Sequence, residues 1–324
     1  MHNRVDYIAA GGDIKYSFLC LKNSNPDTDE AWSGLNSEGF SIMNSVSYNI
    51  RREGDDTPDS QMDQEGFIMY RALATCATIE DFEKLLDGLN APFGIEANFG
   101  VIDARGGAAY YEVNNFEWVK YDVNDPETAP DGYLIRSNYS FSGREGKGQG
   151  YVRYNNAQKN ISELLASGGK IDERWVMDCL SRSYSQSYYK MNPYKEGRSF
   201  FKDKDFIPRK STCAVTIVKG VEKGENPANA YMCTALGYPP ASVLVPMMVA
   251  DGKVVNSDMT SSVKSRRSAA CDRALKRKER IFFKNNDINY VDLEEVRRLQ
   301  SQIKTEEDSI FTDFKIRYEE VKVR

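Results

Sequence analysis

Hydrophobic and polar residues alternate along much of the first fifty positions, a pattern typical of β-strands with one buried face. Phe18 and Cys20, for example, occupy the same face of one such stretch. The segment 32–44 then reads as strand, tight turn and strand, with the turn between Asn36 and Gly39, where glycine adopts positive φ without steric cost. The first fifty residues are therefore predicted to form antiparallel strands.

The period changes to that of helices after residue 60. Phe67 and Tyr70 belong to a set of apolar side chains that recur at helical spacing. Thr78 then starts a second helix as its N-cap, with Asp81 three residues further on. A pair of helices is therefore predicted to follow the first strands.

The later part of the chain repeats this order of strands and paired helices. The individual predictions are strands at 97–103, 109–113, 118–122 and 133–138, helices at 151–166 and 172–183, strands at 212–218, 230–236 and 243–250, and a helical tail from about residue 258. Strand hairpins with helices inserted in pairs favour an α+β fold in which two stacked sheets carry helices on both outer faces.

The composition limits the classes of partner. The chain has 324 residues and a formal net charge of -5, so a dedicated nucleic-acid binder, which needs clustered Lys and Arg, is not expected. The sequence contains no run of 18 apolar residues, so no membrane span is predicted. The first residues lack the basic start and apolar core of a signal peptide. We expect neither nucleic acid nor a membrane as a partner. Localisation stays open, because an upstream segment could carry a signal.

Histidine and cysteine are distributed in a way that argues against two common kinds of site. The sole histidine is His2, and the six cysteines are scattered without a Cys-x-x-Cys spacing. A zinc site draws on histidine or closely spaced cysteine, so no metal is expected, and no cofactor is predicted. A Ser-His-Asp triad would need His2, at a frayed terminus, as its base. The chemistry of this chain is predicted to proceed without histidine.

Four segments carry a family resemblance. They are WSGLNSEGFSIMNS at 32–45, ANFGVIDARGGAAYYE at 97–112, RSNYS at 136–140 and ALGYPP at 235–240. In this order and spacing they resemble the acyl-coenzyme A:6-aminopenicillanate acyl-transferase-like proteins, which are N-terminal-nucleophile (Ntn) hydrolases related to the choloylglycine hydrolases. Each segment alone is a common one, whereas four in register are more specific.

The resemblance implies a four-layer αββα sandwich and an enzyme that hydrolyses linear amides or transfers their acyl group. The family's nucleophile is a cysteine made N-terminal by processing, whose own α-amine serves as the general base in place of histidine. Asn138 matches a strand-end asparagine that the family places near the reacting carbonyl, which implies an oxyanion donor; the alternative is an asparagine that caps a turn. None of the six cysteines is terminal, so the nucleophile is expected upstream of this sequence.

Four further residues are candidates for contacting a small-molecule amide substrate. Asn44 ends a strand and either lines the same pocket as Asn138 or has a structural role. Arg136, on the same predicted strand face as Asn138, is suited to meet a substrate carboxylate. Arg209 lies in the half of the fold where the related hydrolases use an arginine; the alternative, which is favoured, is a solvated arginine at the start of a strand. Tyr188, in a tyrosine-rich run, either lines an acyl pocket or packs in the core.

Two regions are predicted. Residues 1–257 form an Ntn-hydrolase-like domain that lacks its first strand, which would leave an unpaired strand edge beside Asn138. Residues 258–324 form a helical extension that packs either on this body or on a second subunit of a homo-oligomer. Within it, residues 264–280 are basic, as in a solvated helix face or a surface for an anionic partner. A catalytically inactive binding protein with the same fold is the alternative to the enzyme.

Overall fold

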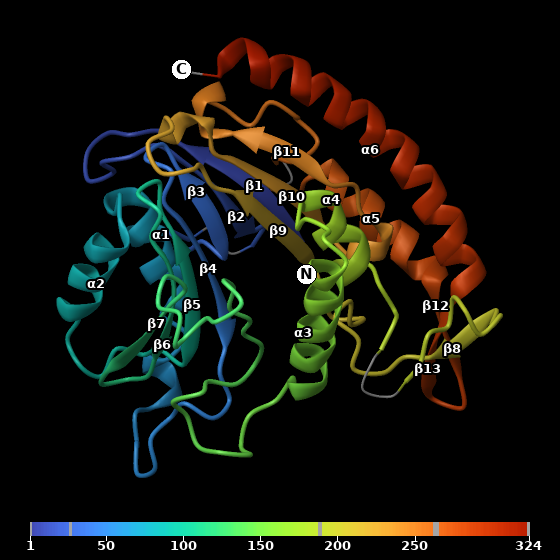
Figure 1. Cartoon of the computed structure of the whole chain (residues 1–324), viewed down its shortest axis with the longest axis horizontal. Coiled ribbons are helices and arrows are strands. Elements are labelled where there is room, and N and C mark those ends of the chain that lie inside the picture. The colour runs from blue at the N-terminus through green and yellow to red at the C-terminus, as the bar shows by residue number, and fades with distance from the viewer. Residues whose placement is uncertain (1, 26–27, 187–189, 262–265, 323–324) are drawn as a thin grey trace.

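The structure, a computed structural model, describes residues 2–25, 28–186, 190–261 and 266–322. Helices lie on the outside of antiparallel strands that form three sheets (Figure 1). The helices are α1 (Glu65–Thr75), α2 (Ile79–Asp87), α3 (Tyr151–Ala166), α4 (Glu173–Trp175), α5 (Ala269–Ile281) and α6 (Leu293–Val321).

The largest sheet is a meander of seven strands in which each strand pairs with the next one in sequence. Its strands are β1 (Asn3–Ile8), β2 (Phe18–Asn23), β3 (Ser33–Asn36), β4 (Ser41–Val46), β5 (Ala97–Ile102), β6 (Ala108–Val113) and β7 (Trp118–Asp122). The predicted turn between β3 and β4 is confirmed. Gly39 has a φ of 75°, and Oδ1 of Asn36 accepts a hydrogen bond from the backbone N–H of Phe40 at 3.1 Å.

The second sheet has three strands in the order β11, β10, β9. Its strands are β9 (Ala214–Lys219), β10 (Tyr231–Leu236) and β11 (Val245–Met248), and a third, small sheet contains β8 (Phe200–Lys202), β12 (Phe282–Asn285) and β13 (Ile288–Asp292). Within the described residues, β9 pairs with β10 alone and is an edge strand. The second sheet is therefore narrower than the seven-stranded sheet.

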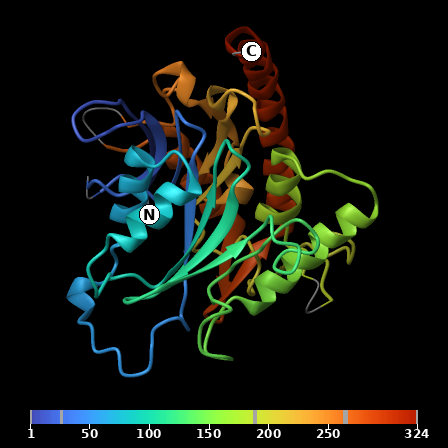
Figure 2. The same cartoon turned by 60° about the vertical axis from the view of Figure 1, so that its left-hand side comes forward.

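The two larger sheets are stacked and carry helices on both outer faces (Figure 2). One face of the seven-stranded sheet packs on α1 and α2, as the edge-to-face contact of Phe82 with Phe99 illustrates. Its other face meets the second sheet, where Leu35 and Met232 belong to one apolar cluster. Phe311 of α6 packs in a cluster on the outer face of the second sheet. The predicted four-layer αββα arrangement is confirmed.

The C-terminal region is only partly helical. A helical tail was expected from about residue 258, and residues 282–292 within it form the hairpin of β12 and β13 instead. Asn286 and Asp287 at its turn both have positive φ, of 47° and 61°. Positive φ at both central residues is the type I′ geometry that matches the twist of a hairpin, and this Asn-Asp pair was the available sequence signal.

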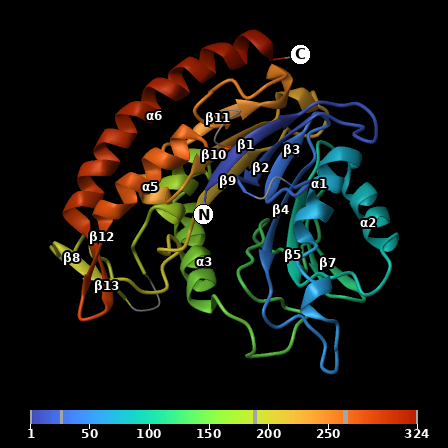
Figure 3. The ribbon, with the colours of Figure 1, turned by 180° about the vertical axis from the view of Figure 1, so that it is seen from behind.

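A buried ion pair fixes α6 to the body of the molecule. Glu307 of α6 pairs with Arg182, and both side chains are buried. Oε1 of Glu307 also accepts the backbone N–H of Leu244 at 2.7 Å, and Nη2 of Arg182 donates to the carbonyl of Ser242 at 2.6 Å. These bonds hold α6 along the outer side of the second sheet (Figure 3).

Candidate active site

Asn138 lies in the connection between β7 and α3. Residues 133–138 were expected to form a strand, but they contain no regular strand, and Asn138 makes a single antiparallel bridge with Gln149. The expectation is therefore wrong for this segment. The side-chain Nδ2 of Asn138 donates to the carbonyl of Val46, at the end of β4, at 2.9 Å. Asn138 is thus held against the end of the sheet without being part of it.

Side chains attach this segment to the sheet. The buried Asn98 of β5 donates through Nδ2 to the carbonyls of Ser137 and Tyr139 at 3.3 and 3.1 Å. Oγ of Ser45 donates to the carbonyl of Ser137 at 2.7 Å, and Oγ of Ser140 donates to Oδ1 of Asn98 at 2.5 Å. Because these side chains satisfy the backbone carbonyls, the segment needs no strand partner there.

Arg153 fixes the orientation of the Asn138 carboxamide. Nη2 of Arg153 donates to Oδ1 of Asn138 at 2.7 Å, and Nε donates to Oδ1 of Asp205 at 3.0 Å. Arginine carries donors and no acceptor, so the atom of Asn138 that faces it is the oxygen, and the amino group points away. Val46 takes one N–H of that amino group. Among the described residues, the second N–H has no acceptor.

Arg153 and Asp205 were not found from the sequence. Arg153 lies in the first turn of α3, next to Gly150, the N-cap, which has a φ of 82°. A Cβ at Gly150 would lie 2.7 Å from Nη2 of Arg153, so the glycine also leaves space for the guanidinium. The glycine-rich loop before α3 was the available signal, but it indicates a tight backbone and not which side chain the loop admits.

Arg209, a predicted substrate-binding residue, lies close enough to Arg153 for its charge to lower the pKa of Arg153. Burial, and then the positive charge of Arg209, lower the pKa of Arg153. Nε of Arg209 is buried and has no hydrogen-bond partner among the described residues. Arg153, Arg209 and the carboxylate of Asp205 together carry a net positive charge. Substrate binding by Arg209 stays a prediction.

Arg136, the second arginine predicted to bind substrate, is engaged in a buried ion pair. Its Nε donates to Oε1 of Glu112 at 2.7 Å, and 2% and 0% of the two side chains are exposed. The guanidinium also packs on the rings of Tyr110, Tyr121 and Phe141, at 5.1, 4.5 and 4.4 Å from their centroids. These contacts give Arg136 a structural role. Contact between Arg136 and a substrate carboxylate stays a prediction.

Asn44 lies on β4, where successive side chains point to opposite faces of the sheet. Its neighbour Met43 lines a cavity between the two sheets, and Ser45 bonds the segment that carries Asn138. Asn44 therefore points towards the face covered by α1 and α2. Its predicted part in the substrate pocket stays a prediction.

Tyr188 lies outside the described residues, so its predicted contact with the substrate stays a prediction. Tyr184, from the same tyrosine-rich run, is fully buried, and its hydroxyl contacts the hydroxyl of Tyr238. That part of the run belongs to a core cluster that it shares with residues of α6 and of the small third sheet.

The cysteines do not have the properties of an activated nucleophile. All six lie within the described residues, and burial raises the pKa of each thiol, that of Cys76 to about 11. An attacking thiol needs a lowered pKa or an adjacent base. The thiolate form is therefore disfavoured at every cysteine. The six residues are Cys20, Cys76, Cys179, Cys213, Cys233 and Cys271.

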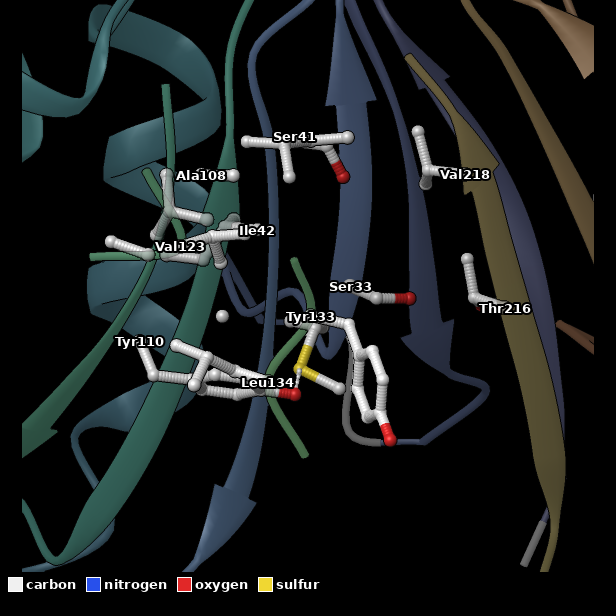
Figure 4. A pocket seen from close by; sticks show the side chains of 15 residues that line it. Ser33, Ser41, Ile42, Ala108, Tyr110, Val123, Tyr133, Leu134, Thr216 and Val218 are labelled. Carbon is white, nitrogen blue, oxygen red and sulfur yellow. Dashed lines mark hydrogen bonds between the residues drawn. The ribbon is translucent and has the colours of Figure 1, made fainter. Parts of the chain in front are cut away.

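A cavity of about 340 Å³ lies between the seven-stranded sheet and the edge strand β9 (Figure 4). Tyr110 and Leu134 line one side, and Thr216 and Val218 of β9 line the other. The cavity lies beside β9, the edge strand of the second sheet. Beyond this edge the inner face of the wider, seven-stranded sheet extends further than the second sheet.

Three hydroxyl groups on the facing sides of the two sheets are buried and have no hydrogen-bond partner in the described part of the chain. They belong to Ser33 on β3, Thr216 on β9 and Thr234 on β10. Thr216 and Thr234 are direct cross-strand neighbours, and Ser33 and Thr216 line the cavity. An unsatisfied buried polar group costs roughly 1–3 kcal/mol, so this region is suited to accept a further polar group.

The described residues contain no cluster of three His, Cys, Asp or Glu side chains that could hold a metal ion. In the same ranges, no helix combines the length and the apolar character needed to cross a membrane.

Comparison with known proteins finds similarity among solved structures. No family model matches the chain, and no curated protein matches its sequence. A variant of the conjugated bile acid hydrolase from Clostridium perfringens is 12% identical, with a TM-score of 0.42 over 78% of this chain and 86% of that one. Penicillin V acylase from Agrobacterium tumefaciens is 12% identical, with a TM-score of 0.41 over 76% and 78% of the two chains.

A third similar structure is the Caenorhabditis elegans ortholog of N-acylethanolamine-hydrolyzing acid amidase. It is 17% identical, with a TM-score of 0.39 over 56% of this chain and 73% of that one. All three proteins are Ntn hydrolases. The likeness is remote and concerns the fold, and the site residues are assigned from this chain's own geometry.

Proposed function

We propose that the protein is a hydrolase or acyl-transferase of linear amides that uses an N-terminal cysteine, supplied by a segment preceding residue 1, and Asn138 as oxyanion donor. The fixed carboxamide of Asn138 carries this proposal. Arg153 holds its oxygen and Val46 takes one of its N–H groups. The second N–H is a preorganised donor, which is the property that an oxyanion hole requires.

The proposed reaction balances without a metal or an imidazole. The α-amine of the terminal cysteine takes the thiol proton, and the thiolate sulfur attacks the carbonyl carbon of the amide. The carbonyl oxygen becomes an oxyanion that accepts a hydrogen bond from the free N–H of Asn138. The C–N bond then breaks, the proton passes to the leaving amine, and a thioester remains. Water or a second amine attacks the thioester and regenerates the thiol.

The properties of this chain's own nucleophiles support a thiol from elsewhere. His2 is the sole histidine, and its Nδ1 lies 3.1 Å from a carboxylate oxygen of Asp272 on α5. Burial raises the pKa of every cysteine thiol in the chain. A cysteine whose own amine is the base needs neither a histidine nor a pre-ionised thiol.

The edge of β9 supports the proposal, because the added segment can pair with this strand. Within the described residues this strand has a neighbour on one side alone, and it lines the cavity between the sheets. A strand added to that edge would pair with the unpaired backbone groups of β9. It would also bring polar backbone groups towards the hydroxyls of Ser33 and Thr216, which lack partners among the described residues.

The charge of the site supports the same reaction. Arg153 and Arg209 outnumber the carboxylate of Asp205, so a developing oxyanion is favoured by the local field. We include Arg209 in the site on this basis. Its buried Nε, without a partner in the described chain, is available to an anionic or carbonyl group of the substrate.

The test is to express the complete natural reading frame, including any codons before residue 1, and to determine the mature N-terminus by intact mass and terminal sequencing. The amide panel comprises a conjugated bile acid, an N-acylethanolamine and penicillin V, the compounds named in the similar structures. We expect an N-terminal cysteine, a mass increase equal to one acyl group after acid quench, and loss of both turnover and adduct when that cysteine is replaced by alanine.

Two results would contradict the proposal. A mature protein without an N-terminal cysteine removes the nucleophile. An N-terminal cysteine that forms no adduct with any amide that the protein binds leaves a binding protein with this fold, which is the alternative that the sequence also allows.

A further inference from the structure

We propose that Arg153 is a positioning residue: it fixes the carboxamide of Asn138 and polarises its free N–H, and Asp205 holds Arg153 in place for this purpose. The inference rests on the proposed function, because it needs Asn138 to be the oxyanion donor. Arg153 itself acts through Asn138 and is not assigned a contact with the substrate.

The guanidinium is held at two points. Its Nη2 donates to Oδ1 of Asn138 at 2.7 Å, while its Nε donates to Oδ1 of Asp205 at 3.0 Å. The side chain of Arg153 is 14% exposed and that of Asp205 is 36% exposed. Because the guanidinium is planar and rigid, two contacts through different nitrogens fix its position and its tilt.

The contact with Asn138 changes the amide as a donor. A cation bound to Oδ1 draws electron density from the carboxamide, and hydrogen bonds that share one amide strengthen each other. The positive charge of Arg153 therefore makes the free N–H of Asn138 a stronger donor to an oxyanion. A neutral hydrogen-bond donor at residue 153 would keep the orientation but not the polarisation.

The backbone beside Arg153 is compatible with this function. Gly150, the N-cap of α3, has a φ of 82°, and a side chain there would lie within 2.7 Å of Nη2 of Arg153 and 2.9 Å of Oγ of Ser137. Helical side chains point back towards the helix N-terminus, which directs Arg153 from the first turn of α3 to the segment of Asn138. Asp205 reaches the same guanidinium from the segment before β9.

A structural role alone would give a different result from positioning. If Arg153 merely ties α3 to the segment 205–209, its loss lowers stability and any effect on kcat is the same whether or not residue 138 is asparagine. If it acts through Asn138, its loss lowers kcat in the natural enzyme and has little effect once Asn138 is alanine. Effects that pass through one shared group are not additive.

The experiment is a double-mutant cycle in the full-length enzyme, with Arg153→Gln, Asn138→Ala and their combination, assayed on one amide substrate. We expect Arg153→Gln to lower kcat roughly 10–100-fold with KM changed less than about threefold, because the uncharged side chain no longer polarises the Asn138 N–H that donates to the oxyanion. In the Asn138→Ala background the same change is expected to alter kcat less than about twofold. Arg153→Lys, which keeps the charge but not the planar fork, should recover only part of the lost activity.

The matched control is Arg52→Gln, since Arg52 is a surface arginine paired with Glu117, and it should leave kcat unchanged. Asp205→Asn is a second variant for the case in which Arg153→Gln does not fold; it should lower kcat less than Arg153→Gln, and only with Asn138 present. Equal loss in both backgrounds, or no loss, overturns the positioning role. If Asn138→Ala is itself fully active, the proposed function has failed instead.

Discussion

Nη2 of Arg153 lies 2.7 Å from Oδ1 of Asn138, although one residue is on helix α3 and the other is in the connection that precedes it. This contact makes the oxygen the end of the carboxamide that faces Arg153, and the amino group the end that points away from it. An asparagine with its oxygen held by arginine can only donate from its other end. The functional reading of Asn138 depends on that orientation.

The first prediction concerns Asn138 itself. Asn138→Ala should lower kcat of the full-length protein roughly 10²–10³-fold with little change in KM, because an oxyanion donor acts in the transition state. Steady-state hydrolysis of an amide measures the effect. Asn124→Ala is the control, since Asn124 bonds the Gly106 carbonyl on an exposed turn. Equal activity of the two variants would show that Asn138 takes no part in the reaction.

The second prediction concerns the edge of β9. If an upstream segment adds a strand there, amide exchange over residues 214–219 should be at least about tenfold slower in the full-length protein than in the chain starting at Met1. Hydrogen exchange read by mass spectrometry compares the two. The peptide covering β10, which is paired on both sides in the structure, serves as the internal reference. Equal exchange over 214–219 would exclude pairing at this edge.

The third prediction concerns the anchor of α6. Glu307→Ala should destabilise the protein by about 3–5 kcal/mol, because it removes the buried partner of Arg182 and leaves only the half-exposed Asp178 to pair with this arginine. Urea unfolding measures the change. Glu306→Ala on the same helix should cost less than about 1 kcal/mol, since Glu306 is exposed and its contact with Arg277 is 3.4 Å long. Similar values for both would show that the buried pair does not hold α6.

The fourth prediction concerns the cysteines and pH. A thiol reacts with iodoacetamide as its thiolate, and burial raises the pKa of Cys76 to about 11. At pH 8 about one Cys76 thiol in a thousand is ionised, and this fraction rises about tenfold for each pH unit up to pH 10. Intact mass in native buffer should therefore show slow labelling of the six cysteines. Rapid labelling of one of these cysteines at pH 8 would make that cysteine a candidate nucleophile.

The fifth prediction concerns Arg136. Arg136→Gln should lower the free energy of unfolding by about 3 kcal/mol or more, because it leaves the fully buried Glu112 without its cation. Chemical denaturation measures this, alongside KM for a carboxylate-bearing amide. A raised KM with unchanged stability would instead support contact with a substrate carboxylate.

Most local elements and the order of the layers could be predicted from the sequence. Residues 151–166 were predicted as a helix and form α3 with the same bounds. Thr78 was predicted to cap α2, and its Oγ1 accepts the N–H of Asp81 at 3.2 Å. These features depend on side chains a few positions apart, so periodicity and capping rules are sufficient to find them.

The contacts between side chains at the site could not be predicted from the sequence, because they depend on tertiary packing. Periodicity gives the face on which a side chain lies but not what it contacts, so the strand expected at 133–138 became a segment held by Asn98 and Ser45. The partner of Asn138 comes from α3, and the partner of that arginine lies 52 residues further along the chain. Such contacts form when elements distant in sequence pack together, and no local pattern specifies them.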